Sequence, residues 1–231
     1  EVIVLFFAIL LTPFLATKFG IPIGLIEPLL PIHILWINLV TDSLPALALA
    51  VDPAADNVMK RKPLKNTKKG IFTKGMTWRI VYQGLMIGVL TLVAFIIGLA
   101  TPENELPVVN ITEANGIVRT LSTEEVKVEI GQAMAFTVLA LSELVLVFNI
   151  RDNKRSIFKT GIFNNSKLIL ATVVSASLMF VILFTQGLRD IFGLVMLPAM
   201  HVFETVMLVL APVIIVEIFK LLKINTTKDE E

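Results

Sequence analysis

LWINLVTDSLPA, residues 35–46, places oxygen-bearing side chains inside an apolar block long enough to cross a membrane. Asn38, Thr41 and Asp42 are three and four residues apart, a spacing that a helix displays on one face. An ionised carboxylate at the centre of a bilayer costs on the order of 3 kcal/mol, so its default interpretation is functional. Pro45 lacks a backbone N–H, and its ring clashes with the carbonyl of Thr41. The segment therefore offers a carboxylate, an amide, a hydroxyl and a freed carbonyl, the ligands that a hard cation prefers.

The rest of the chain is built of similar apolar blocks. Hydrophobic residues make up 55% of the 231 residues, and the mean hydropathy is +0.83. Each block approaches the roughly 20 residues that a helix needs to cross the hydrocarbon core. We predict an all-α, polytopic membrane helix bundle of six spans, the first truncated at its start because the chain begins inside an apolar block. The predicted spans cover residues 2–17, 29–51, 79–100, 130–150, 167–187 and 194–219.

Basic residues are distributed very unevenly between the connections. Sixteen of the twenty Lys and Arg lie in residues 52–79, 151–167 and 220–231. Cytoplasmic connections carry the excess of Lys and Arg in membrane proteins. The pattern therefore predicts a cytoplasmic C-terminus, cytoplasmic loops at 52–78 and 151–166, and an outer loop at 101–129.

A second carboxylate lies inside a predicted span. Glu143 is about two-thirds of the way along the fourth block, and no basic residue is closer than Arg151. It is either a second cation ligand facing Asp42 or a protonated residue that packs between helices. Glu1 opens the first block, where hydropathy does not define its depth. The chain has no cysteine, which excludes thiolate metal ligation.

Other polar residues lie near the ends of the spans. His33, His201 and Glu204 lie toward the outer ends of the second and sixth blocks. We interpret them as helix-end side chains that reach interfacial water rather than as ligands. Taken by themselves, the residues predict a helical membrane domain with a carboxylate-rich cation site, and they leave open what drives the ion.

The stretch 35–46 resembles the sixth transmembrane helix of P-type cation ATPases. The resemblance continues through AVDP at 50–53, the basic loop ending near Lys74, the span that contains Glu143, and APV at 211–213. It covers essentially residues 1–231 as the C-terminal transmembrane domain, helices five to ten. Within that family the chain is most similar to calcium pumps of the sarcoplasmic-reticulum type and their bacterial relatives.

The resemblance implies an ATP-driven pump that passes through an aspartyl-phosphate. It implies that Asn38, Thr41 and Asp42 are sixth-helix ligands, that Glu143 is the eighth-helix ligand, and that Glu1 is a fifth-helix ligand. ATP and Mg²⁺ would be bound by the pump's other domains, so this chain alone should not hydrolyse ATP. The implied partners are upstream helices and cytoplasmic domains of the same monomeric pump and the lipid bilayer, without nucleic acid. The implied location is the plasma membrane of a bacterium.

The same residues bear on which ion is carried. Sodium and potassium pumps have aspartate where this chain has Asn38, and secretory-pathway calcium pumps have methionine where it has Thr41. The pattern therefore favours export of Ca²⁺, with protons returning to the vacated carboxylates. Alternatives remain: a P-type pump for Mn²⁺ or a monovalent cation, a secondary antiporter or channel, or a membrane scaffold. Ser43 replaces the glycine often found after the aspartate, so the helix break there depends on Pro45.

Overall fold

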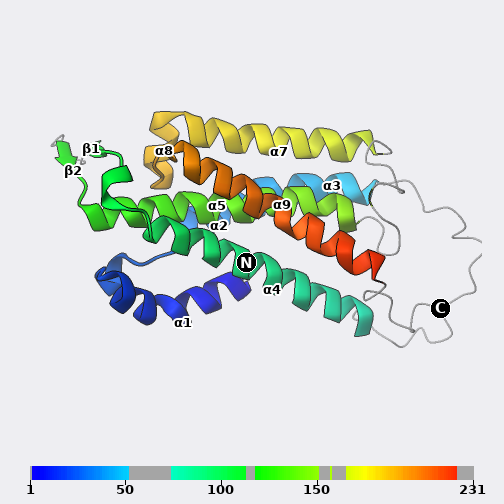
Figure 1. Ribbon diagram of the computed structural model, residues 1–231. Helices are drawn as coiled ribbons and strands as arrows, with labels where there is room; N and C mark the ends of the chain where they lie inside the picture. The colour runs from blue at the N-terminus through cyan, green and yellow to red at the C-terminus, as the bar shows by residue number, and fades with distance from the viewer. Residues whose placement is uncertain (1, 52–73, 113–117, 151–156, 158–164, 223–231) are drawn as a thin grey trace, which may run out of the picture.

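The computed structural model describes residues 2–51, 74–112, 118–150, 157 and 165–222. Within them the chain forms a bundle of long helices, and six helical segments are long and apolar enough to cross a membrane (Figure 1). The prediction of an all-α, six-span bundle is confirmed. The long helices are α1 (Val2–Phe19), α4 (Lys74–Leu99), α5 (Thr123–Ile150), α7 (Ser166–Phe184) and α9 (Ala199–Leu221). The second span is composite: α2 (Pro31–Trp36), a π-helical segment η2 (Ile37–Asp42) and α3 (Ser43–Ala50).

Local sequence signals explain where several helices begin and end. Ser122 and Glu125 cap the start of α5 reciprocally, each accepting the other's backbone N–H at 3.3 and 2.8 Å. The Asn165 side chain accepts the N–H of Leu168 at 2.9 Å and so caps α7. Helix α1 is followed by Gly20 at φ +67°, a left-handed conformation that glycine adopts without steric cost.

Helix α5 is the centre of the bundle. In its apolar part 72% of the residues are buried, against 17–28% in the other five spans. Its tightest neighbour is α4, which crosses it where Gly98 meets Gly131. A Cβ atom built on Gly98 would lie 2.3 Å from the Cα of Gly131, so the two backbones are in direct contact. Small residues at such crossings let membrane helices pack closely.

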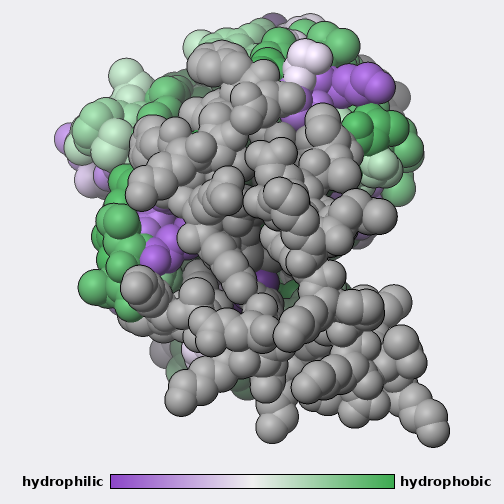
Figure 2. Space-filling view, turned by 90° about the vertical axis from the view of Figure 1, so that its right-hand side faces the viewer, coloured by the Kyte–Doolittle hydropathy of each residue, from purple (hydrophilic) through white to green (hydrophobic). Residues whose placement is uncertain are grey.

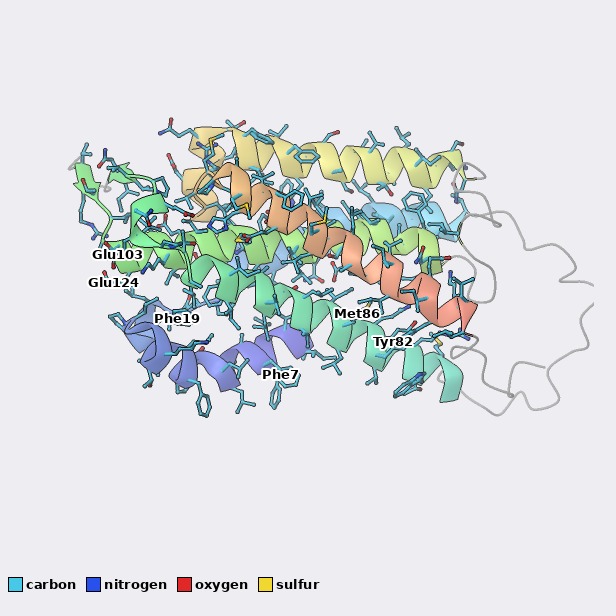
Figure 3. All side chains as sticks on the ribbon, in the orientation of Figure 1. Phe7, Phe19, Tyr82, Met86, Glu103 and Glu124 are labelled. Atoms are coloured by element: carbon cyan, nitrogen blue, oxygen red, sulfur yellow. The ribbon has the colours of Figure 1, made fainter. Side chains whose placement is uncertain are left out.

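The two ends of the bundle differ in chemistry. The segments α3, α5 and α9 finish, and α4 and α7 begin, at one end (Figure 1). Tyr82 lies toward that end, whereas Glu103 and Glu124 lie at the opposite one (Figure 3). In a view from the first end, hydrophobic residues form much of the visible left and upper rim of the bundle, with hydrophilic residues between them (Figure 2). Exposed apolar side chains along the spans fit a protein whose surrounding solvent is lipid.

The second end contains two features that the sequence patterns did not indicate. A two-stranded antiparallel ribbon, β1 (Asn110–Thr112) with β2 (Val118–Thr120), lies inside the predicted outer loop. Helix α7 ends at Phe184 instead of continuing to residue 187, and a separate short helix α8 (Gln186–Phe192) follows it. The predicted loops 52–78 and 151–166 lie largely outside the described residues.

The interpretation of the histidines as water-facing is wrong. His33 is fully buried; its Nδ1 accepts the Leu30 N–H at 3.1 Å, and its Nε2 lies 2.8 Å from the carbonyl of Phe192. One ring nitrogen accepts and the other donates, so the ring is the neutral tautomer with both nitrogens satisfied. The imidazole also stacks on Phe136, with ring centroids 4.5 Å apart. Hydropathy did not reveal Phe192 and Phe136 as partners, because they belong to the distant helices α8 and α5.

His201 is likewise buried, in a network that joins the end of α4 to the start of α9. Its Nε2 lies 3.0 Å from the hydroxyl of Thr101, which itself donates to the carbonyl of Gly98 at 2.7 Å. Its Nδ1 lies 2.7 Å from a carboxyl oxygen of Glu204. The imidazole therefore ties two spans together at the second end of the bundle.

Candidate cation site

The widened helical turn of η2 follows from the chemistry of its residues. A π turn pairs each carbonyl with the N–H five residues later instead of four. Pro45 has no N–H to offer, so the normal ladder cannot run through this region. Side-chain hydroxyls supply local substitutes: Thr41 Oγ1 donates to the carbonyl of Ile37 at 2.7 Å, and Ser43 Oγ donates to that of Asn38 at 2.8 Å. The predicted break at Pro45 thus takes the form of a π segment beginning eight residues earlier, supported by Ser43.

Next to this segment lies an open cavity of about 440 Å³. Thr41 and Asp42 from η2, Gln83 and Gly84 from α4, and Glu143 from α5 are among the residues that line it. The remaining lining is mainly apolar. The cavity therefore collects oxygen-bearing side chains from three spans in otherwise hydrophobic surroundings.

Two carboxyl groups meet in this cavity. The side chains of Asp42 and Glu143 both line it, one from η2 and the other from α5. Two ionised carboxylates in one cavity repel each other, and a proton on either group would remove that repulsion. A cation placed between them would remove the same repulsion with its own charge. The arrangement is thus suited to hold either a proton or a metal ion.

The predicted residues are placed differently relative to this cavity. Thr41 is buried, Asp42 is exposed, and both line it, whereas Asn38 is exposed and is not among the lining residues. The Asn38 amide instead donates to the carbonyl of Ile34 at 2.9 Å. The three side chains that were expected on one helix face therefore do not all face the cavity. The π turn changes the angular spacing that an α-helix would give them. Glu1 lies outside the described residues.

The described residues of the cavity offer fewer oxygen atoms than a calcium ion takes. Calcium takes six to eight oxygen ligands. No cluster of three or more His, Asp or Glu occurs within the part of the chain that the structure describes. Asp42, Glu143 and Thr41 fit the ligand chemistry of a hard cation, and the other oxygens must come from groups beyond these.

Sequence reasoning missed a residue that supports the site. Ser175 in α7 is fully buried, and its hydroxyl donates to the carbonyl of Val40 in η2 at 3.0 Å. The signal available in the sequence was a serine within an otherwise apolar block. Serine is common enough in membrane helices that the signal alone did not single it out.

Comparison with known proteins agrees with the geometry. The sequence profile of a family described as "Cation transporting ATPase, C-terminus" matches residues 26–222. "Calcium-transporting ATPase 1" of Bacillus cereus is 36% identical over 225 residues, which are 97% of this chain and 23% of that protein. "Calcium-transporting ATPase" of Bacillus subtilis is 37% identical over 193 residues, covering 83% of this chain and 18% of the relative.

The similarity extends to eukaryotes. "Endoplasmic reticulum calcium ATPase srcA" of Aspergillus fumigatus is 26% identical over 214 residues, covering 88% of this chain and 21% of the relative. The chain thus spans about a fifth of the length of the curated relatives it matches.

Proposed function

Because the chain belongs to the P-type cation-transporting ATPase family, as its C-terminal membrane part, we propose that it is the ion-binding portion of an ATP-driven calcium pump. The observation that carries this proposal is the meeting of Asp42 and Glu143 in one cavity with Thr41. The names of the bacterial and fungal relatives favour Ca²⁺ over Mn²⁺ or a monovalent ion.

In the proposed cycle, Ca²⁺ binds from the cytoplasm between Asp42 and Glu143, with Thr41 as a neutral ligand. Asn38 and Glu1 complete the ligand set together with helices upstream of this chain. When the ion leaves on the other side, protons replace it on the two carboxylates and return to the cytoplasm. The placement of both carboxyl groups in one cavity supports that exchange, because either a proton or a cation would relieve the repulsion between their charges.

The proposed orientation follows from charge. The segments 52–79, 151–167 and 220–231 carry most of the Lys and Arg, so we assign the end of the bundle from which they extend to the cytoplasm. The bacterial relatives favour the plasma membrane of a bacterium as the location, with the pump acting as a monomer. ATP and Mg²⁺ are assigned to cytoplasmic domains of the parent protein, which carry out phosphorylation.

Phosphoenzyme formation from ATP in the intact parent protein tests this proposal. Labelling should require calcium, and Glu143→Gln should shift the requirement to higher calcium concentrations. Glu103→Gln is the matched control, because that side chain is 78% exposed at the other end of the bundle. Labelling that is indifferent to calcium but responds to manganese or a monovalent ion would reassign the cargo. No labelling of a folded protein would favour the antiporter or channel interpretation.

Vesicle measurements test the proton step separately. Calcium uptake by the reconstituted pump should be accompanied by an opposite movement of protons, visible with a pH-sensitive dye in tight vesicles. Uptake that leaves the internal pH unchanged would refute counter-transport while leaving the calcium assignment intact.

A further inference from the structure

Helix α7 contacts the second span through one polar side chain at the level of the cation site. Ser175 is fully buried, and its hydroxyl reaches the carbonyl of Val40 at 3.0 Å. Val40 lies in the π segment directly before Thr41 and two residues before Asp42. The contact therefore joins α7 to the backbone that carries two residues of the candidate site.

The carbonyl of Val40 lies where the helix passes from the π segment η2 to the α-helix α3. In the π register its partner would be the N–H of residue 45, which is Pro45 and has none, so within the helix only the N–H of Leu44 could reach it, in the α register. A carbonyl buried in an apolar environment without a hydrogen bond is costly. The serine hydroxyl supplies a donor to this carbonyl from another helix, so it can hold the point where the register changes. The next carbonyl, that of Thr41, is the one that Pro45 leaves without a partner in the α-helical register.

We propose that Ser175 is a positioning residue for the cation site: it holds the π turn of η2 in register, and so fixes Thr41 and Asp42 opposite Glu143. The proposal deepens the proposed function and rests on it for the identity of the ion. Ser175 itself does not line the cavity, so its effect on the ion passes through the backbone of η2. On this view α7, which contributes no cation ligand, still tunes cation affinity.

A neighbouring hydroxyl provides a matched control. Thr172 lies three residues before Ser175 on α7, and its Oγ1 is buried without a hydrogen-bond partner in the described part of the chain. Thr172→Val removes a hydroxyl from the same helix, near Ser175, without removing a bond to η2. A general effect of lost polarity in α7 would appear in both variants, whereas a positioning effect would appear only in Ser175→Ala.

The test uses the intact parent protein and two readouts. Ser175→Ala should raise the calcium concentration for half-maximal phosphorylation about fivefold, the effect of losing one typical hydrogen bond. The maximal level of phosphorylation should remain at the wild-type value, and the melting temperature should fall only slightly, as expected for the loss of one hydrogen bond. Amide hydrogen exchange in a peptide covering residues 37–44 should accelerate in Ser175→Ala and remain unchanged in Thr172→Val. If Ser175→Ala fails to assemble, Ser175→Cys keeps the volume with a weaker donor and should show a smaller shift in the same direction.

The outcomes separate this inference from the proposed function. If wild-type labelling depends on calcium but Ser175→Ala leaves the half-maximal concentration unchanged, Ser175 is not a positioning residue. A loss of maximal phosphorylation and melting temperature without a shift in the half-maximal concentration would also overturn it, since that is the signature of packing alone. If wild-type labelling ignores calcium, the proposed function fails. The exchange rates of residues 37–44 then decide the inference: acceleration supports it, and unchanged rates overturn it.

Discussion

The two halves of the bundle are packed differently: one contains a close helix crossing and the other an open cavity. In the half where α4 ends, Gly98 and Gly131 bring two helix backbones into direct contact, and His33 is buried with both ring nitrogens satisfied. In the half where α4 begins, an open cavity of about 440 Å³ is lined by residues of η2, α3, α4 and α5. One half thus contains a close crossing of two helix backbones and a buried histidine whose ring nitrogens are both paired. The other concentrates carboxyl groups and irregular backbone around an open space.

This difference shows where the molecule is rigid and where it can change. Interiors packed at high density do not adjust to a new side chain without loss of stability. Irregular backbone in a membrane is tolerated only where it is buried in protein or lines a cavity, and η2 meets that condition. A cation that must enter and leave needs the second kind of environment, and the first kind provides a fixed frame for it.

The largest effect is expected from a larger side chain at the crossing of Gly98 and Gly131, in the half where α4 ends (the rigid half). Gly98→Ala places a Cβ atom 2.3 Å from the Cα of Gly131, so the α4–α5 crossing must open. We expect a loss of about 3 kcal/mol or more in stability, measured as a lower melting temperature of the parent protein in detergent. Gly187→Ala is the matched control, because nothing lies within 4 Å of a Cβ there. Equal losses in the two variants would show that the crossing is looser than the structure indicates.

The second-largest effect is expected from removing the charge of Asp42 in the half that contains the cavity (the open half). Asp42→Asn keeps the size of the side chain but removes a charge from the cavity, so we expect calcium affinity to fall at least about 100-fold, or about 2.7 kcal/mol. The melting temperature should hardly change, because the residue is exposed. Calcium-dependent phosphorylation measures the effect, with Asp190→Asn on the exposed surface of α8 as the control. Unaltered calcium dependence in Asp42→Asn would exclude this carboxylate from the site.

The features that could be predicted from the sequence are those that leave a signal in one local stretch of the chain. Hydropathy located all six spans, because a membrane helix forms its backbone hydrogen bonds within its own segment. Each span is therefore visible in the sequence as a local run of apolar residues. The two mid-span carboxylates could be singled out for the same reason: a charge among apolar residues is a local signal. Which helices would bring the two carboxylates together could not be read from the sequence, and the fold places both in the lining of one cavity.

What the sequence did not reveal depends on distant partners. The carbonyl of Val40 in η2 accepts a hydrogen bond from Ser175 in another helix, and the buried imidazole of His33 lies against the carbonyl of Phe192 far along the chain. Periodicity describes which face a helix buries, not which neighbour donates to a particular carbonyl. The predicted single face for Asn38, Thr41 and Asp42 failed in part because the α-helical spacing does not apply across a π turn.

The third effect tests whether a buried histidine belongs to the frame or to the ion pathway. His33→Phe retains an aromatic ring against Phe136 but leaves the Leu30 N–H and the Phe192 carbonyl without their partners. We expect a loss of about 2 kcal/mol in stability, seen as a lower melting temperature, with the calcium dependence of phosphorylation unchanged. A weaker response to calcium at an unchanged melting temperature would instead place His33 on the ion pathway.

The smallest effect is expected from Glu204→Gln, an acidic residue of the rigid half. The Glu204 carboxyl group lies 2.7 Å from Nδ1 of His201, and its side chain is 29% exposed. A glutamine keeps an oxygen that can accept from the same nitrogen, so only the charge is lost, and a partly exposed ion pair contributes about 1 kcal/mol or less. We therefore expect a melting temperature close to that of the wild type and an unaltered response to calcium. If Glu204→Gln weakened calcium-dependent phosphorylation as much as Asp42→Asn does, an acidic group outside the cavity would be as important to the ion as one inside it. The division of the bundle into a fixed frame and an ion-binding half would then be wrong.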